Sequence, residues 1–307
     1  MPTPAYLKPI NHNQNRRALW HNYYDRAVYM VTVSKHSLCP SFGSLVYNNP
    51  KDAFINLSAC GEIIKMQIEI TPNYHPQLKV LSYVIMPDHA HILVHVTEPI
   101  EKHLGDIIQA MKSASTSAIR NLLSIRDLQV FDEGFNDRIV SNKQQLDTLY
   151  RYLRDNPRRL AVRRAHPEFF RRVNRLKIGE KYYQAYGNFQ LLECPFKEQV
   201  VVHRADTPEV RERNRQGWLY GAANGGVLVS PFISQAEKAI RTEADEAGGR
   251  FIYITNQPLA ERYKPSGCDF ELCESGRMLI VSANIEGDLN RTACLAMNSL
   301  AETICKD

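Results

Sequence analysis

The sequence predicts an α+β protein in two parts, of which the second is a smaller unit built on a parallel sheet. In the first part, apolar runs rich in β-branched and aromatic residues are interspersed with segments of helical periodicity. From about residue 185, short apolar strands alternate with helical segments, which is typical of a parallel α/β unit. A chain of 307 residues also exceeds what one hydrophobic core usually covers. We therefore predict domains over residues 1–180 and 181–307.

The elements follow in order along the chain. The strands of the first part are predicted over 27–36 and 80–96, and the helices over 57–76, 104–123 and 141–156. Ser141 or Asn142 suits the N-cap of the last of these helices. Pro157 is expected to end it, because the residue before a proline is pushed away from helical dihedral angles. The alternating segments of the second part are VVVHR, PEVRERNRQGWLYGAA, GVLVSP, SQAEKAIRTEADEAG, RFIYIT and RMLIVSA.

Composition indicates a folded protein of the reducing cytoplasm. Apolar residues make up 44% of the chain, without a run of 18 or more and without a signal-peptide core near the N-terminus. The seven cysteines are scattered and form no CxxC pair, so neither a disulfide framework nor a zinc knuckle is indicated. We expect no membrane partner.

Positive charge is concentrated in one segment, residues 151–177. The whole chain carries a formal charge of +5, whereas this segment alone carries ten Arg or Lys and two acids, a net of +8. Such a local surplus fits contact with a polyanion, because each cation at a phosphate releases a condensed counterion. A solvated helix face explains the same pattern equally well.

Two histidines stand two residues apart in the apolar stretch LSYVIMPDHAHILVHV. Strand side chains alternate between faces, so His89 and His91 point the same way and can converge on one ion. Pro87 and Asp88 indicate a bend where the strand starts. The alternative is a hydrogen-bonded pair without a ligand. His95 lies on the same face, and we interpret it as structural.

A second pair of polar residues lies on the helix predicted over 141–156. Tyr152 and Asn156 are four residues apart, so both project from one helix face. A tyrosine can act as a covalent nucleophile beside a metal, and the amide oxygen can be a further metal ligand. The alternatives are a core aromatic for Tyr152 and a helix stop for Asn156.

Together these motifs resemble a known family. The chain contains GEII, VIMPDHAH, LGDIIQAMKSAST and GFNDRIVSNKQQLDTLYRYLRDNP in that order, the last ending in a YxxxNP motif. This combination, spread over residues 15–165, resembles the single-tyrosine transposases of the HUH endonuclease superfamily, and most closely the REP-associated tyrosine transposases. The resemblance implies a ferredoxin-like antiparallel sheet, with the histidines on a central strand that faces the tyrosine helix.

The same resemblance implies an activity. Mg²⁺ or Mn²⁺ would be held by His89, His91 and Asn156, and Tyr152 would attack single-stranded or hairpin DNA to give a 5′-phosphotyrosine and a free 3′-OH. Monomer and homodimer both remain open. The residues expected to bind DNA are the arginines beside the nucleophile: Arg151, Arg154, Arg158, Arg159, Arg163 and Arg164.

The second part is expected to be Rossmann-like, with Ser230 or Ser234 before a helix as a candidate anion site. It contains neither GxGxxG nor a P-loop, which favours a structural or DNA-clamping module over a nucleotide site. Two further functions remain as alternatives. One is a DNA-binding regulatory protein with an inactive transposase site, and the other is a nucleotide-binding α/β enzyme.

Overall fold

The computed structural model describes residues 21–261, 263–285 and 287–306. It divides the chain into two compact units, Met1–Ala161 and Val162–Asp307, called unit 1 and unit 2 below. The division falls earlier than the expected boundary at 180/181. That boundary would separate two strands, β7 (Arg171–Ile178) and β8 (Lys181–Gly187), which pair with each other in one sheet.

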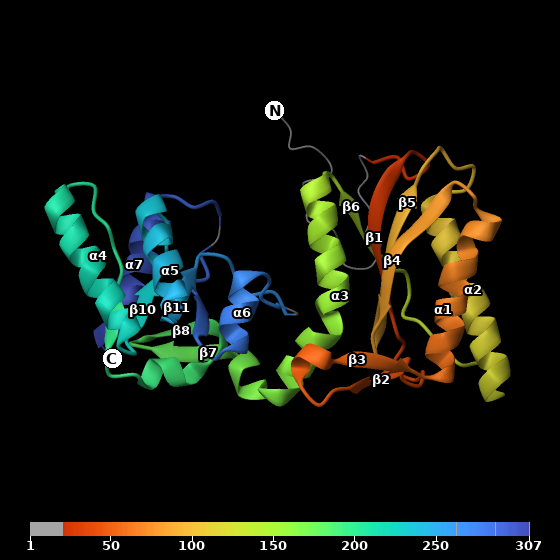
Figure 1. Cartoon of the computed structure of the whole chain (residues 1–307), viewed down its shortest axis with the longest axis horizontal. Coiled ribbons are helices and arrows are strands. Elements are labelled where there is room, and N and C mark those ends of the chain that lie inside the picture. Colours follow the sequence, from red (N-terminus) through yellow and green to blue (C-terminus); the bar gives the residue numbers. More distant parts are fainter. Residues whose placement is uncertain (1–20, 262, 286, 307) are drawn as a thin grey trace. The chain divides into compact units, whose positions relative to one another are not determined.

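Unit 1 is built on a four-stranded antiparallel sheet (Figure 1). Its strands are β1 (Ala27–Ser34), β4 (Leu78–Ile85), β5 (His89–Val96) and β6 (Asn136–Val140), in the order β4-β5-β1-β6. Every neighbouring pair is antiparallel, and the two central strands are β5 and β1. This is the ferredoxin-like arrangement, so the expected fold class is confirmed for unit 1. A separate two-stranded sheet, β2 (Gly43–Val46) with β3 (Phe54–Leu57), was not predicted.

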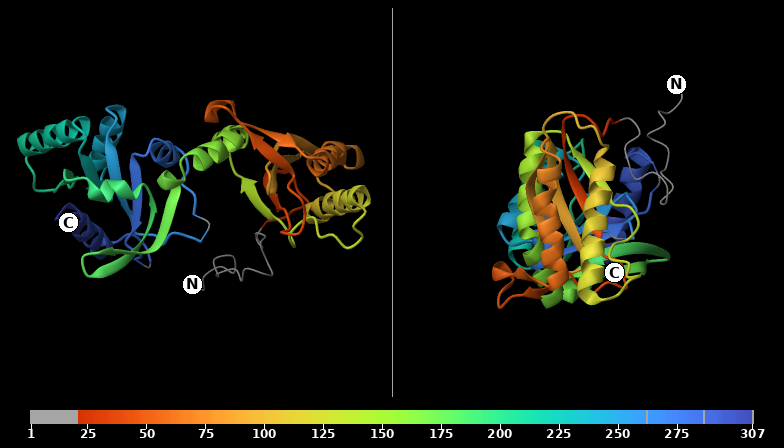
Figure 2. Two further views of the ribbon diagram at one scale, coloured as in Figure 1. Left: turned by 90° about the horizontal axis from the view of Figure 1, so that it is seen from below. Right: turned by 90° about the vertical axis from the view of Figure 1, so that its right-hand side faces the viewer.

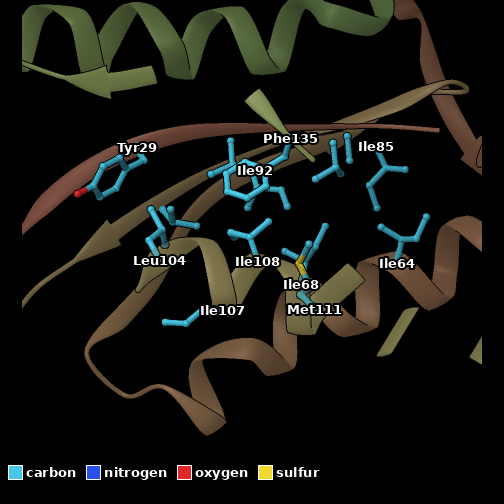
Figure 3. Close-up of a cluster of buried hydrophobic side chains, with 14 of the residues drawn as sticks. Tyr29, Ile64, Ile68, Ile85, Ile92, Leu104, Ile107, Ile108, Met111 and Phe135 are labelled. Atoms are coloured by element: carbon cyan, nitrogen blue, oxygen red, sulfur yellow. The ribbon is translucent and has the colours of Figure 1, made fainter. Parts of the chain in front are cut away.

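Helices cover both faces of this sheet (Figures 1 and 2). On one face α1 (Ala59–Tyr74) and α2 (Leu104–Leu123) lie side by side, and on the other lies α3 (Lys143–Ala165). The main core lies between the sheet and the first two helices (Figure 3). It includes Ile64 and Ile68 of α1, Ile108 and Met111 of α2, and Ile92 of β5.

A smaller apolar cluster joins the opposite face of the sheet to α3. Leu93 of β5 packs there with Leu149 and Leu153, all three buried. Because neighbouring residues of a strand face opposite sides, Ile92 and Leu93 belong to different clusters. β5 therefore has one face toward the main core and one toward α3.

Two expectations for unit 1 are wrong. Residues 80–96 form two strands and a turn, β4 and β5, in which the Met86 backbone N–H donates to the carbonyl of His89 at 2.7 Å. Pro87 suits this turn because it needs no N–H donor in the sheet. Likewise, α3 does not end before Pro157 but continues through it to Ala165. The N-cap expectation fits Asn142, whose side-chain oxygen accepts from the Gln145 N–H at 2.8 Å.

Unit 2 is the expected parallel α/β unit with an antiparallel extension. Its six-stranded sheet has the order β7-β8-β12-β11-β10-β9. The strands β9 to β12 are parallel, whereas β8 runs antiparallel to β12, and β7 to β8. The bounds of these four parallel strands are β9 (Lys197–Gln199), β10 (Val227–Ser230), β11 (Arg250–Thr255) and β12 (Met278–Ser282).

Helices pack on both faces of this sheet as well. α7 (Arg291–Lys306) covers one face, and α4 (Pro208–Ala223), α5 (Gln235–Glu246) and α6 (Cys268–Glu274) contribute to the core on the other. The strand expected at VVVHR is absent, since the short edge strand β9 ends just before it. Of the described helices, none combines the length and the apolar character that a membrane crossing requires.

Candidate active site

The two histidines of β5 lie on the sheet face that α3 covers. His89 and His91, the histidine pair, have ring centroids 4.6 Å apart. Both alternate with Ala90 and Ile92, which are buried in the main core on the other face. His91 is 7% exposed, whereas the His89 side chain keeps 20% of its surface. The pair is thus close together, with one ring buried and the other partly open to solvent.

Each imidazole is held through its Nδ1 atom. His89 Nδ1 lies 2.7 Å from Asp88 Oδ1, and His91 Nδ1 lies 2.7 Å from Thr32 Oγ1. Thr32 stands directly opposite His91 in the pairing of β1 with β5. When Nδ1 carries the proton in such a bond, Nε2 keeps its lone pair, which is the arrangement found around metal-binding histidines.

Tyr152 approaches the histidine pair from α3. Its hydroxyl lies 3.5 Å from His91 Nε2, at the outer limit of a hydrogen bond, and the two rings are 5.5 Å apart. The guanidinium of Arg159 lies over the Tyr152 ring at 5.7 Å. Residues 61 positions apart in the chain are therefore brought together, with a positive charge beside the phenol.

Asn156 lies one helical turn beyond Tyr152. It is 6% exposed, and its side-chain Nδ2 donates to the Tyr152 carbonyl at 2.8 Å. With the amide nitrogen engaged in this way, Oδ1 is the atom that can face a ligand. Among the described residues there is no cluster of three or more His, Cys, Asp or Glu side chains suited to a metal ion. A metal at this site would thus need the amide or another oxygen ligand besides the histidine pair.

Tyr150 lies near Tyr152 on the same helix. Both tyrosines pack against the small cluster formed by Leu93, Leu149 and Leu153. Two residues along a helix correspond to a rotation of about 200°, so the two rings flank this cluster from different edges of α3. Of the two tyrosines, Tyr152 has its hydroxyl and its ring beside His91.

His95 lies on the same face of β5, further along the strand. Burial lowers its pKa, and the nearby charges of Arg26 and Lys79 act in the same direction. A histidine whose charged form is disfavoured in this way fits a packing role.

The six arginines expected to bind DNA all lie on α3, in different environments. Arg158 forms an ion pair with Asp155 at 2.5 Å, and Arg159 covers the Tyr152 ring. Arg151 and Arg154 are exposed. The remaining two, Arg163 and Arg164, belong to unit 2. The basic segment 151–177 is therefore no single surface, since it runs through α3 and then into β7.

The anion site expected before α5 is already filled by the protein itself. The carboxylate of Glu237 accepts from the backbone N–H groups of Val202, Ile233 and Ser234 at 2.8–3.1 Å. Ser234 caps the helix in return, and Ser230 accepts from the Phe232 N–H. The helix terminus and the serines thus serve an internal carboxylate, which removes the main support for a nucleotide site there.

A polar cavity of about 1180 Å³ lies elsewhere in unit 1, between α2 and the loop before β6. Lys112, Arg120 and Arg126 are among the residues that line it. Lys112 and Arg120 also donate to backbone carbonyls of that loop, so these two cations hold the loop against the helix.

The fold and these side chains define a class of protein. An antiparallel ferredoxin-like sheet presents two imidazoles to a tyrosine on the covering helix, a set suited to covalent phosphoryl transfer. Residues 60–156 match the family model described as "Transposase IS200 like". The matched residues include the histidine pair, Tyr152 and Asn156. The resemblance seen in the sequence is confirmed, and with it a transposase-like, DNA-processing class of function.

Individual proteins are similar to the chain at low identity. An uncharacterised protein of Haemophilus influenzae is 23% identical over 176 residues, which cover 50% of this chain and 93% of that protein. A REP-associated tyrosine transposase bound to a REP hairpin is 14% identical, with a TM-score of 0.33, over 45% of this chain and 70% of its own. DNA processing protein A (DprA) of Streptococcus pneumoniae is 18% identical, with a TM-score of 0.32, over 80% and 74%.

Two contacts of the histidine pair were not predicted from the sequence: that of Thr32 with His91, and that of Asp88, which was assigned only to a bend, with His89. Asp88 could have been found from its place next to His89. Thr32 could not, because its partner lies 59 positions away and is fixed by the register of β1 with β5.

Proposed function

We propose that unit 1 is a metal-dependent endonuclease and strand transferase for single-stranded DNA, and that it works through a covalent bond to Tyr152. The observation that carries this proposal is the approach of the Tyr152 hydroxyl to His91 Nε2, at 3.5 Å, on the sheet face that also bears His89. A tyrosine in such a place needs no bound water to open a phosphodiester, because its own oxygen is the nucleophile.

The residues present fit a divalent cation such as Mg²⁺ or Mn²⁺. Both imidazoles have an Nδ1 partner at 2.7 Å, which orients Nε2 as a ligand. Asn156 would add a neutral oxygen, the type of ligand that hard cations prefer, and no thiolate takes part. When bound, such an ion polarises the scissile phosphate and stabilises negative charge on its oxygens.

The reaction proposed for the side chains is an in-line displacement. The Tyr152 oxygen bonds to phosphorus while the bond from phosphorus to the 3′ oxygen breaks. The phenol loses its proton and the leaving 3′ oxygen gains one, so the products are a 5′-phosphotyrosine and a free 3′-OH without consumption of water. A second 3′-OH can then attack the phosphotyrosine and reverse the step on another strand.

The charges beside Tyr152 support DNA as the substrate. Arg159 lies over the tyrosine ring, and the exposed Arg151 and Arg154 lie on the same stretch of α3. Arg158 contributes less, because its charge is balanced by Asp155. An unpaired strand, including the unpaired part of a hairpin, is flexible enough to bring its phosphodiester backbone to Tyr152.

The test is a trapping experiment with the full chain, Mn²⁺ and a panel of end-labelled single strands and hairpins. We expect a labelled band that survives denaturation and carries the fragment downstream of the cut, joined to the protein through its 5′ phosphate. Tyr152→Phe should form no such band yet bind the same DNA, since one hydroxyl is lost and the ring is kept. Strand binding without an adduct in the parent protein would leave a DNA-binding protein with an inactive site.

A further inference from the structure

The hairpin of β7 and β8 in unit 2 carries an unbalanced positive charge. Its residues 171–187 include three arginines, two lysines and a single acid, Glu180. Arg172 is engaged within the fold, where its guanidinium donates to the carbonyls of Leu259, Ala260 and Glu261. The other cations, Arg171, Arg175, Lys177 and Lys181, are exposed.

These exposed cations differ in their ion pairing from three other arginines of unit 2. Arg215, Arg241 and Arg277 each pair with a carboxylate of a neighbouring element. By contrast, Arg175, Lys177 and Lys181 have no ion pair with any residue that the structure describes. Charge that a fold leaves unbalanced on one exposed hairpin is available to a polyanion.

An aromatic ring lies among these cations. Tyr182 of β8 is 56% exposed, and the Arg175 guanidinium lies 4.7 Å from its ring centroid. Lys177 is the cross-strand partner of Tyr182. The three side chains therefore form one group, the hairpin patch, defined as Arg175, Lys177 and Tyr182. β7 is also an edge strand of its sheet, with β8 as its strand neighbour among the described residues.

We propose that the hairpin patch is a second binding surface for single-stranded DNA, with phosphates at Arg175 and Lys177 and one base stacked on Tyr182. Stacking needs an unpaired base, because a base inside a duplex has no free face, so the exposed ring selects single strands. The choice of DNA as the polymer rests on the function proposed for unit 1. The patch itself requires neither metal nor Tyr152.

The experiment measures binding of a labelled oligothymidine to the full chain in EDTA, at several salt concentrations, by fluorescence anisotropy. The test variant is Arg175→Gln/Lys177→Gln/Tyr182→Ala. Its matched control is Arg213→Gln/Lys238→Gln/Tyr220→Ala, which removes an arginine, a lysine and a tyrosine that are also exposed in unit 2. We expect the test variant to bind at least about tenfold more weakly, since one stacked base and two phosphate contacts are lost.

The salt dependence of binding separates the phosphate contacts from base stacking. The slope of log affinity against log salt should fall by about 1.4 in the test variant, about 0.7 for each lost phosphate contact. Tyr182→Phe should bind like the parent, and Tyr182→Ala should weaken binding with little change in slope. Melting temperatures of all variants report folding independently.

Several results would overturn the proposal. One is a test variant whose affinity and salt slope equal those of the parent. Another is a control variant that loses as much affinity as the test variant. If duplex DNA bound as tightly as oligothymidine, base stacking on Tyr182 would be contradicted. If oligouridine bound more tightly than oligothymidine, DNA would not be the preferred polymer. Because no adduct is measured, a negative result here is distinct from failure of the chemistry at Tyr152.

Discussion

Replacing Thr32 with Val should lower both the folding stability and the metal affinity of the protein. Thr32 is not itself a residue proposed to bind metal or DNA. The hydroxyl of Thr32 lies 2.7 Å from Nδ1 of His91, a side chain that is only 7% exposed. Val keeps the β-branched shape and removes the hydrogen bond, so the imidazole nitrogen is left without this partner. A buried polar group that loses its partner costs about 1–3 kcal/mol of folding stability. Loss of such an orienting contact lowers metal affinity by about 10–100-fold.

Two measurements check this prediction separately. Urea unfolding without metal should show the loss of stability, and calorimetric titration with Mn²⁺ should show the weaker binding. Thr32→Ser is the matched control, because it keeps the hydroxyl and should keep most of the Mn²⁺ affinity. If Thr32→Val bound Mn²⁺ as tightly as the parent, the contact with His91 would have no part in orienting a ligand, and the reasoning would be refuted.

Three other predictions concern the pair, the helix and the pH dependence of stability. Either member of the histidine pair replaced by Ala should abolish metal-dependent cleavage with an unchanged circular dichroism spectrum, and cleavage at the parental rate would disprove the ligand assignment. Arg154→Gln should lower the salt slope of single-strand binding by about 0.7, whereas Arg158→Gln should change it less because Asp155 already balances that charge. Burial lowers the pKa of His95, so the unfolded chain takes up a proton first as pH falls below about 6.5, and stability should fall with it. His95→Asn should reduce the change in the free energy of unfolding between about pH 7 and 5, measured with urea. An unchanged pH dependence in this variant would contradict the assignment of the effect to His95.

Helix periodicity carried most of what could be predicted about the fold. The helices expected over 57–76 and 104–123 correspond to α1 at Ala59–Tyr74 and α2 at Leu104–Leu123. Both have a continuous apolar face against the main core, and such a face leaves a clear period in the sequence. The strand expected over 80–96 was too long for one ordinary strand, and its length could have revealed the hairpin with its turn at Pro87.

Where the sequence misled, longer-range packing decided the outcome. Pro157 removes one backbone donor, yet α3 continues, with the apolar residues Leu149 and Leu153 buried against the sheet just before it. The charged stretch after Ala165 fitted either a polyanion contact or a solvated helix face, and the helix interpretation is wrong there because the stretch contains β7, an edge strand, where charged side chains are tolerated.

The candidate site was predictable only in part for a similar reason. Alternation along a strand and the four-residue spacing on a helix were enough to place the histidine pair on one face and Tyr152 with Asn156 on another. That these two faces meet depends on the packing of α3 against β5, which no local pattern encodes. The roles of Thr32 and Glu237 likewise depend on register and on contacts distant in sequence.

The central claim is that Tyr152 forms the bond to DNA, and mass spectrometry of the trapped adduct tests it most directly. The adduct is formed with Mn²⁺ and a cleavable strand, digested with protease and nuclease, and the peptide carrying the remaining nucleotide is sequenced. Tyr150 and Tyr152 lie in one peptide region, so fragmentation must separate them, and Tyr150→Phe should keep the adduct while Tyr152→Phe loses it. We predict a phosphorylated nucleotide on Tyr152. A modification on Tyr150, or an adduct that persists in Tyr152→Phe, would contradict the account.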